Sequence, residues 1–193
     1  MSGREVAIGE VARDAIGSLV ARGLTVGTAE SLTGGLVAAA LTSVPGASAV
    51  VRGGIVAYAA DLKASLLWVP DELLGRVGTV HPEVAIAMAR GARKRLGADI
   101  GLATTGVAGP DAVDGHRVGT VHVALALGRS AGFQLACDPM RGPESAGGPE
   151  PGEPEVVIRH AALSLAGDRD QIRGQTVRHA LRLLIAAITE ERD

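Results

Sequence analysis

Residues 28–35, Thr-Ala-Glu-Ser-Leu-Thr-Gly-Gly, connect an apolar, strand-like segment to a run of helix-forming residues, and this junction determines the fold expected for the chain. The segment 24–26 is short and apolar, as in a buried strand, whereas residues 36–41 have the composition of a helix. Thr33 and the two glycines after it therefore fall at the helix N-terminus, where unpaired backbone N–H groups favour an anion. A simpler interpretation is equally open, in which Thr33 is only an N-cap and the glycines only form a tight turn.

Strand-like and helical segments alternate along the rest of the chain. The expected helices cover residues 6–22, 36–41, 61–67, 70–74, 83–96 and a last helix capped by Asp168 or Asp170. The expected strands cover residues 24–28, 50–58 with a bulge at Gly53-Gly54, 100–104, 118–127, 132–137 and 156–165. This alternation predicts an α/β fold whose sheet is covered on both faces and is partly parallel. A hairpin formed by 118–127 and 132–137 is expected to add antiparallel strands.

Length and composition restrict the class of protein. A chain of 193 residues with 47% hydrophobic residues is long enough for one α/β core, so we expect a single domain over residues 1–193. The net charge of −2 gives no basic surface for nucleic acid or an anionic membrane. No segment reaches the ~18 apolar residues that span a bilayer. Together with a single cysteine, Cys137, these features predict a cytoplasmic protein.

Residues 138–155 differ in composition from the rest of the chain. They contain five prolines and four glycines among few apolar residues. This composition predicts a Pro/Gly-rich loop inserted into the domain rather than a packed element.

The sequence gives no sign of a nucleotide cofactor or a metal. No G-x-G-x-x-G follows a strand and no G-x-x-x-x-G-K-[ST] occurs. The five histidines lack metal-ligand spacing, and His122 and His160 fall in strand-like runs where a structural role is expected. A phosphatase would need clusters of metal-binding carboxylates, which are absent. We therefore expect neither a cofactor nor a metal.

Ser31 and Lys63 are the residues that suggest nucleophilic chemistry. Ser31 lies at a strand-to-helix turn, and Lys63 lies at the start of another helix that follows a loop. A lysine acts as a base only when burial or nearby positive charge lowers its pKa towards neutrality. The neighbours of Lys63 are largely apolar, as desolvation requires, but a lysine on a short amphipathic helix can also be simply solvated.

Further motifs follow residues 28–35 along the chain. They are Arg52–Tyr58, Lys63, Thr105–Asp111, Val118–Val121 and Gly167–Asp170. Together they cover most of residues 6–190 and resemble, in order, the motifs of the CinA C-terminal domain family. The resemblance implies a three-layer α/β/α sandwich with a mixed, mostly parallel sheet, and a homodimer. It also implies the stand-alone form, without the additional N-terminal domain of many relatives.

The family resemblance also implies an activity, because its characterised members are nicotinamide-nucleotide amidohydrolases. The expected reaction is hydrolysis of nicotinamide mononucleotide to nicotinate mononucleotide and ammonia in pyridine-nucleotide recycling. Amide hydrolysis requires a nucleophile, a proton acceptor and donors for an oxyanion. We expect Ser31 to be the nucleophile, Lys63 the base and Tyr58 a partner that orients Lys63 or relays a proton.

The remaining expected site residues bind the substrate. Thr105 and the N–H of Gly106 are candidates for holding the carboxamide or its oxyanion. Glu30 is expected to bind ribose hydroxyls or the lysine, and Arg52 to contact the substrate. The helix N-terminus formed by Thr33, Gly34 and Gly35 is expected to bind either the phosphate or the oxyanion.

Three departures from the family pattern leave an alternative open. Ala60 stands where a polar residue is usual, His81 replaces a serine before the long helix, and Ala112 and Val113 replace glycines. His81 is either a cap or a titratable group at the pocket edge, and Ala112 and Val113 adopt positive φ less freely than glycine. The alternative function is a non-catalytic nucleotide-binding or interaction module, linked to competence or DNA damage, that retains the fold.

Overall fold

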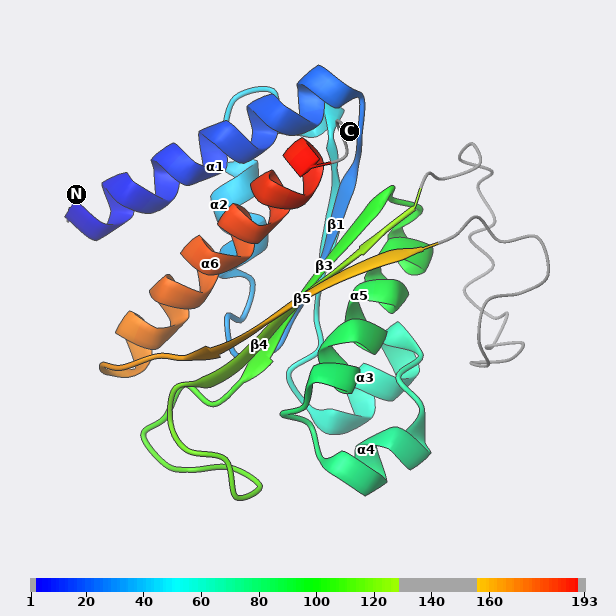
Figure 1. Ribbon diagram of the computed structural model, residues 1–193, viewed down its shortest axis with the longest axis vertical. Helices are drawn as coiled ribbons and strands as arrows, with labels where there is room; N and C mark the ends of the chain where they lie inside the picture. Colours follow the sequence, from blue (N-terminus) through cyan, green and yellow to red (C-terminus); the bar gives the residue numbers. More distant parts are fainter. Residues whose placement is uncertain (1–2, 129–155, 191–193) are drawn as a thin grey trace.

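The computed structural model describes residues 3–128 and 156–190, which alternate between helices and strands (Figure 1). The helices are α1 (Gly3–Arg22), α2 (Leu36–Thr42), α3 (Ala60–Leu67), α4 (Asp71–Val77), α5 (Pro82–Leu96) and α6 (Arg169–Glu190), with a 3₁₀ turn at Ala47–Ala49. The strands are β1 (Val26–Glu30), β2 (Val51–Val56), β3 (Ile100–Gly106), β4 (Thr120–Leu127) and β5 (Val157–Ser164). The expected strand 132–137 and the expected loop insertion 138–155 lie outside the described residues.

The five strands form one mixed sheet in the order β2-β1-β3-β4-β5. β1 is parallel to both β2 and β3, whereas β4 runs antiparallel to β3 and to β5. β4 therefore lies between two antiparallel neighbours, β3 and β5, and the expected hairpin of 118–127 with 132–137 stays a prediction. Between β1 and β2 the register shifts once, from Val26↔Val51 to Gly27↔Gly53, so Arg52 is the extra residue of a bulge.

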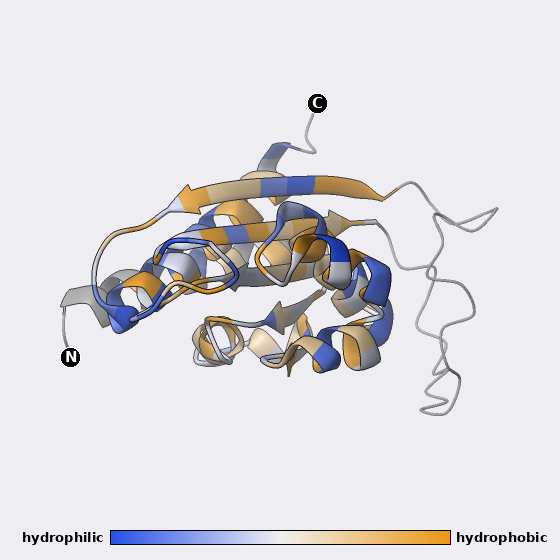
Figure 2. Cartoon of the chain, turned by 90° about the horizontal axis from the view of Figure 1, so that it is seen from below, coloured by the Kyte–Doolittle hydropathy of each residue, from blue (hydrophilic) through white to orange (hydrophobic). Residues whose placement is uncertain are grey.

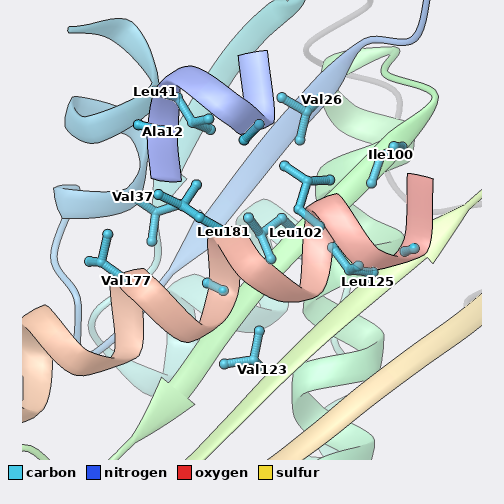
Figure 3. Close-up of a cluster of buried hydrophobic side chains, with 14 of the residues drawn as sticks. Ala12, Val26, Val37, Leu41, Ile100, Leu102, Val123, Leu125, Val177 and Leu181 are labelled. Carbon is cyan, nitrogen blue, oxygen red and sulfur yellow. The ribbon is translucent and has the colours of Figure 1, made fainter. Parts of the chain in front are cut away.

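Helices cover both faces of the sheet, which confirms the three-layer α/β/α architecture. α1, α2 and α6 lie on one face, and α3, α4 and α5 lie on the other (Figure 1). Figure 3 shows how side chains from α1, α2 and α6 meet those of the strands in the larger core cluster. Its labelled residues are Ala12, Val26, Val37, Leu41, Ile100, Leu102, Val123, Leu125, Val177 and Leu181.

Small residues bring α5 unusually close to the sheet. The strand faces beneath α5 carry alanines such as Ala103, Ala124 and Ala126. A Cβ on Gly101 of β3 would lie 1.9 Å from the carbonyl oxygen of Ala89 in α5. The backbone of the helix therefore rests almost directly on β3, and this close packing requires glycine at 101.

β1 extends further along the chain than the expected strand 24–28. All five of its residues are buried, including Thr28 and Glu30. Polar residues normally indicate the end of a strand, but this strand is an interior strand of the sheet, between β2 and β3. Ser31 consequently follows directly after the carboxyl end of a buried strand.

The edge strand β5 combines hydrophilic and hydrophobic residues along its length (Figure 2).

Within the described part of the chain, no helix has the length and apolar character needed to cross a membrane.

Candidate active site

The carboxyl ends of the three parallel strands bring the candidate catalytic residues to one edge of the sheet. Ser31 follows β1, Tyr58 follows β2, and Thr105 lies near the end of β3. Hydrogen bonds continue the strand pairing past these ends, because the N–H of Ser31 donates to the carbonyl of Thr104 and the N–H of Ala57 to that of Glu30. In open α/β sheets, ligands bind at such carboxyl ends.

Lys63 projects from α3 to the end of β1 and is buried there, with an exposed fraction of 1%. Its Nζ lies 3.1 Å from Ser31 Oγ, 2.8 Å from the carbonyl oxygen of Ala57 and 3.2 Å from that of Tyr58. The structure therefore brings together the two residues that the sequence placed 32 positions apart. No acidic side chain among the described residues forms an ion pair with Lys63.

Burial lowers the pKa of Lys63 from 10.5 to about 8, because the charged ammonium loses its hydration. A neutral amine has two hydrogens and one lone pair. The carbonyls of Ala57 and Tyr58 can accept the two hydrogens, which leaves the lone pair directed at the hydroxyl of Ser31. The arrangement suits proton transfer from Ser31 to Lys63.

An open pocket lies beside this pair. Its lining comprises Ser31, Leu32, Tyr58, Thr79, Val80, Thr105, Gly106, Val107, Ala108, Gly109, Asp111, Val113 and Arg169. The hydroxyl of Thr105 donates to the carbonyl of Thr79 at 2.7 Å, so its oxygen can accept a hydrogen bond from a ligand. Four of the expected site residues, Ser31, Tyr58, Thr105 and Gly106, thus line one cavity.

Glu30 does not face the pocket, contrary to its expected role in binding ribose or lysine. Its buried carboxylate accepts hydrogen bonds from the N–H groups of Gly35, Val37 and Ala38, at 2.8 to 3.0 Å. The carboxylate therefore caps the amino end of α2 from within the protein. This contact also anchors the short loop that contains Ser31.

The N–H groups at the start of α2 are bonded within the protein, so the geometry does not favour the anion site expected there. The N–H of Gly34 donates to the carbonyl of Ser31, and the N–H of Gly35 is bonded to Glu30. The hydroxyl of Thr33 is paired with that of Thr104 in the interior. A phosphate or an oxyanion would have to displace a carboxylate that the fold already supplies.

Tyr58 contacts Lys63 through its backbone carbonyl rather than through its phenol, which departs from the role expected for its side chain. The side chain is 57% exposed, and its hydroxyl accepts a hydrogen bond from Arg169 Nη2 at 2.9 Å. The phenol is thus held at the pocket mouth instead of beside the amine.

Two arginines at the start of α6 have no role in the sequence prediction, although Arg169 belongs to the motif 167–170. Arg169 lines the pocket, and Arg173, one turn later, donates to the carbonyls of Leu32 and Thr33 at 3.1 and 3.0 Å. The loop that contains Ser31 is therefore fixed from both sides. Glu30 binds N–H groups at the end of the loop, and Arg173 binds the carbonyl groups of the loop. The i, i+4 spacing of the arginines was the available signal, because it places both on one helix face.

Among the other expected or doubtful residues, Arg52, His81 and Ala112 do not line the pocket, whereas Val113 does. Arg52 is at the amino end of β2, where its Nε donates to the carbonyl of Leu96, and its expected role in substrate binding stays a prediction. His81 caps α5 by accepting from the N–H of Glu83. In the 107–119 loop the positive φ values belong to Gly109, Asp114, Gly115 and Gly119, so Ala112 and Val113 fit without strain.

The described residues contain no group of three or more His, Cys, Asp or Glu side chains that could hold a metal ion. His122 and His160 stack on each other across β4 and β5, with Nδ1 and Nε2 3.2 Å apart. Burial lowers the pKa of His122 to about 4, and a neutral pair suits the structural role expected for both residues.

Comparison with known proteins connects this geometry to a family. The family model of the CinA C-terminal domain matches residues 9–138. A CinA-like protein from Frankia casuarinae is 46% identical over 88% of this chain, and a competence-damage inducible protein from Symbiobacterium thermophilum is 44% identical over 91%. The chain spans about a third of the length of these curated relatives, 33% and 37%.

Solved structures share the fold over nearly their whole length. A CinA superfamily protein from Klebsiella pneumoniae has a TM-score of 0.78 at 27% identity, with 95% of this chain and 98% of that chain covered. The competence/damage inducible protein CihA from Agrobacterium tumefaciens has a TM-score of 0.75 at 37% identity, with 93% and 94% covered. The chain therefore belongs to the CinA C-terminal domain family.

Proposed function

We propose that the protein is an amidohydrolase that converts nicotinamide mononucleotide to nicotinate mononucleotide and ammonia. The observation that carries the proposal is the buried Lys63, with Nζ 3.1 Å from Ser31 Oγ and a pKa lowered to about 8. A strongly perturbed lysine beside a hydroxyl nucleophile at a pocket is typical of a catalytic site. The choice of nicotinamide mononucleotide rests on the resemblance to characterised family members.

The proposed reaction begins with neutral Lys63. Its lone pair takes the proton of Ser31 as Oγ attacks the carboxamide carbon, which gives a tetrahedral intermediate and an ammonium on Lys63. The ammonium returns the proton to the leaving nitrogen, the C–N bond breaks and ammonia leaves. Lys63 then takes a proton from water as the water oxygen attacks the ester carbon, the C–Oγ bond breaks, and the ammonium returns the proton to Ser31 Oγ as the acid leaves and ionises to the carboxylate.

Two groups in the pocket are suited to binding the substrate, one for the oxyanion of the intermediate and one for the carboxamide nitrogen. Leu32 lines the pocket directly after Ser31, and we assign its N–H to the oxyanion, as for the residue after the nucleophile in α/β-hydrolases. The hydroxyl oxygen of Thr105 can accept from the carboxamide nitrogen, because its proton is directed at Thr79. Thr105 therefore positions the group that leaves as ammonia.

Ammonia release from nicotinamide mononucleotide tests the proposal. Purified protein should release ammonia and nicotinate mononucleotide in equal amounts, and Ser31→Ala should not. Binding of the nucleotide without ammonia release would contradict the proposal and favour the non-catalytic module. The homodimer and the cytoplasmic location stay predictions, which sedimentation and cell fractionation would check.

A further inference from the structure

Arg169 is the first residue of α6, and its guanidinium is held at the mouth of the pocket. Nη1 donates to the carbonyl of Gly109 at 2.6 Å, and Nη2 donates to the hydroxyl of Tyr58 at 2.9 Å. These contacts join three segments, since Gly109 belongs to the loop after β3 and Tyr58 to the loop after β2. The start of α6 and the 107–119 loop lie at the same end of the molecule (Figure 1). The guanidinium is therefore oriented before any ligand binds.

The charge of Arg169 has no carboxylate partner within 4.0 Å among the described residues. Its neighbours in sequence are committed elsewhere, because Asp168 accepts from the N–H of Gln171 and Asp170 lies beside Arg173. Asp111 lines the same pocket without forming an ion pair with Arg169. An oriented cation with neutral hydrogen-bond partners can bind an anionic ligand without first breaking a salt bridge.

We propose that Arg169 binds the phosphate monoester of the substrate and makes the enzyme selective for the nucleotide over its nucleoside. This inference rests on the proposed function. In the nucleotide, the phosphate and the carboxamide are at opposite ends. In the pocket, Arg169 lies at the mouth, where the phosphate would bind, and Ser31 lies beside Lys63, where the carboxamide would react. Asp111 supplies acceptors for hydroxyl groups, which the ribose carries between the two ends. The phosphate thus has a cation to bind, which the start of α2 does not supply.

Comparing nicotinamide mononucleotide with nicotinamide riboside isolates the phosphate. The wild type should prefer the mononucleotide in kcat/KM by about 10- to 100-fold, the range expected for charge-assisted hydrogen bonds. Arg169→Ala should bring this ratio close to one, mainly by raising KM for the mononucleotide. Arg169→Lys, which keeps the charge but not the fork, should retain part of the preference.

Two control variants separate this role from a structural one. Tyr58→Phe removes one of the two contacts that orient Arg169 but keeps the guanidinium, so a reduced preference for the mononucleotide should persist. Arg182→Ala removes an exposed arginine further along α6 and should leave the ratio unchanged. If Arg169→Ala lowers kcat/KM equally for both substrates, the inference is overturned while the amidohydrolase proposal stays intact.

Absence of ammonia release from both substrates would mean that the proposed function is wrong, and this outcome is distinct from failure of the Arg169 inference. If the wild type releases ammonia from neither substrate, calorimetric binding of nicotinate mononucleotide and nicotinate riboside still tests Arg169. Tighter binding of the mononucleotide that Arg169→Ala abolishes would support the phosphate site. Equal affinities of the wild type for the two ligands would overturn it.

Discussion

Replacing Lys63 tests the proposed base directly. A lysine with a pKa of 10.5 would be neutral in about 0.03% of molecules at pH 7, whereas a pKa of about 8 makes about a tenth neutral. Since the neutral amine is the reactive form, kcat/KM should rise about tenfold from pH 6 to 7 and about tenfold again from pH 7 to 9, with a plateau above pH 9. Lys63→Ala should reduce kcat by roughly 10²- to 10⁴-fold, the usual contribution of a general base.

Lys63→Arg distinguishes a base from an electrostatic anchor. Guanidinium stays protonated in proteins, so this variant should be nearly as inactive as Lys63→Ala. Lys94 is the chain's other lysine and is exposed near the end of α5, which makes Lys94→Arg the matched control with normal activity expected. Substantial rescue by arginine at 63, with alanine chiefly raising KM, would refute the Ser–Lys mechanism.

An independent measurement of the pKa does not depend on turnover. Because the chain contains two lysines, ¹³Cε-lysine labelling should give two resolvable NMR titrations. One signal should titrate near pH 8 and disappear in Lys63→Arg, and this midpoint should match that of the pH–rate profile. A Lys63 signal that titrates above pH 10 would refute the reasoning, whatever the kinetics show.

Three other substitutions test the surroundings of this pair. Ser31→Ala should fold normally, by circular dichroism, and lose roughly three or more orders of magnitude in kcat, whereas retention of a tenth of the activity would exclude Ser31 as nucleophile. Glu30→Gln should lower the free energy of unfolding in urea by roughly 2 kcal/mol, because an amide is a weaker acceptor for three N–H groups; unchanged stability would contradict the capping role. Gly91→Ala places a Cβ 2.1 Å from the carbonyl oxygen of Leu67 at the end of α3, so Tm and kcat should both fall, and a wild-type Tm would contradict this close packing.

Local signals in the sequence predicted most of the elements but not all of their limits. Pro82 at the first position and Gly97 with φ +57° after the last turn delimit α5 as expected for a helix start and stop. The predicted strand 24–28 lies two residues before the observed β1, because Glu30 is polar and its burial depends on N–H groups of α2. The β4–β5 pairing was missed because it joins residues far apart in sequence, and hairpin rules favour near neighbours.

For the site, the sequence identified side chains more reliably than their partners. Ser31 and Lys63 were predicted as a pair, and the parallel order of β1 and β2 explains why they meet. The geometry does not favour the anion site expected at Thr33 to Gly35, because a helix N-terminus also attracts a carboxylate of the protein, here that of Glu30. Arg169 lies in the predicted motif 167–170 but neither it nor Arg173 receives a role from the sequence, since packing of the start of α6 beside the loops after β1 and β3 is a tertiary feature.

The energetic cost of Lys63 argues against a module that has lost its chemistry. A pKa lowered from 10.5 to about 8 corresponds to roughly 3 kcal/mol of destabilisation of the charged form in the folded state. This cost is present below pH 8 and declines as pH rises towards 10.5, because only there does the unfolded chain bind more protons than the folded one. Structural needs at this position could be met by an apolar side chain without the penalty. A buried amine directed at Ser31 is what proton transfer requires, so we regard the amidohydrolase as the better explanation of this residue.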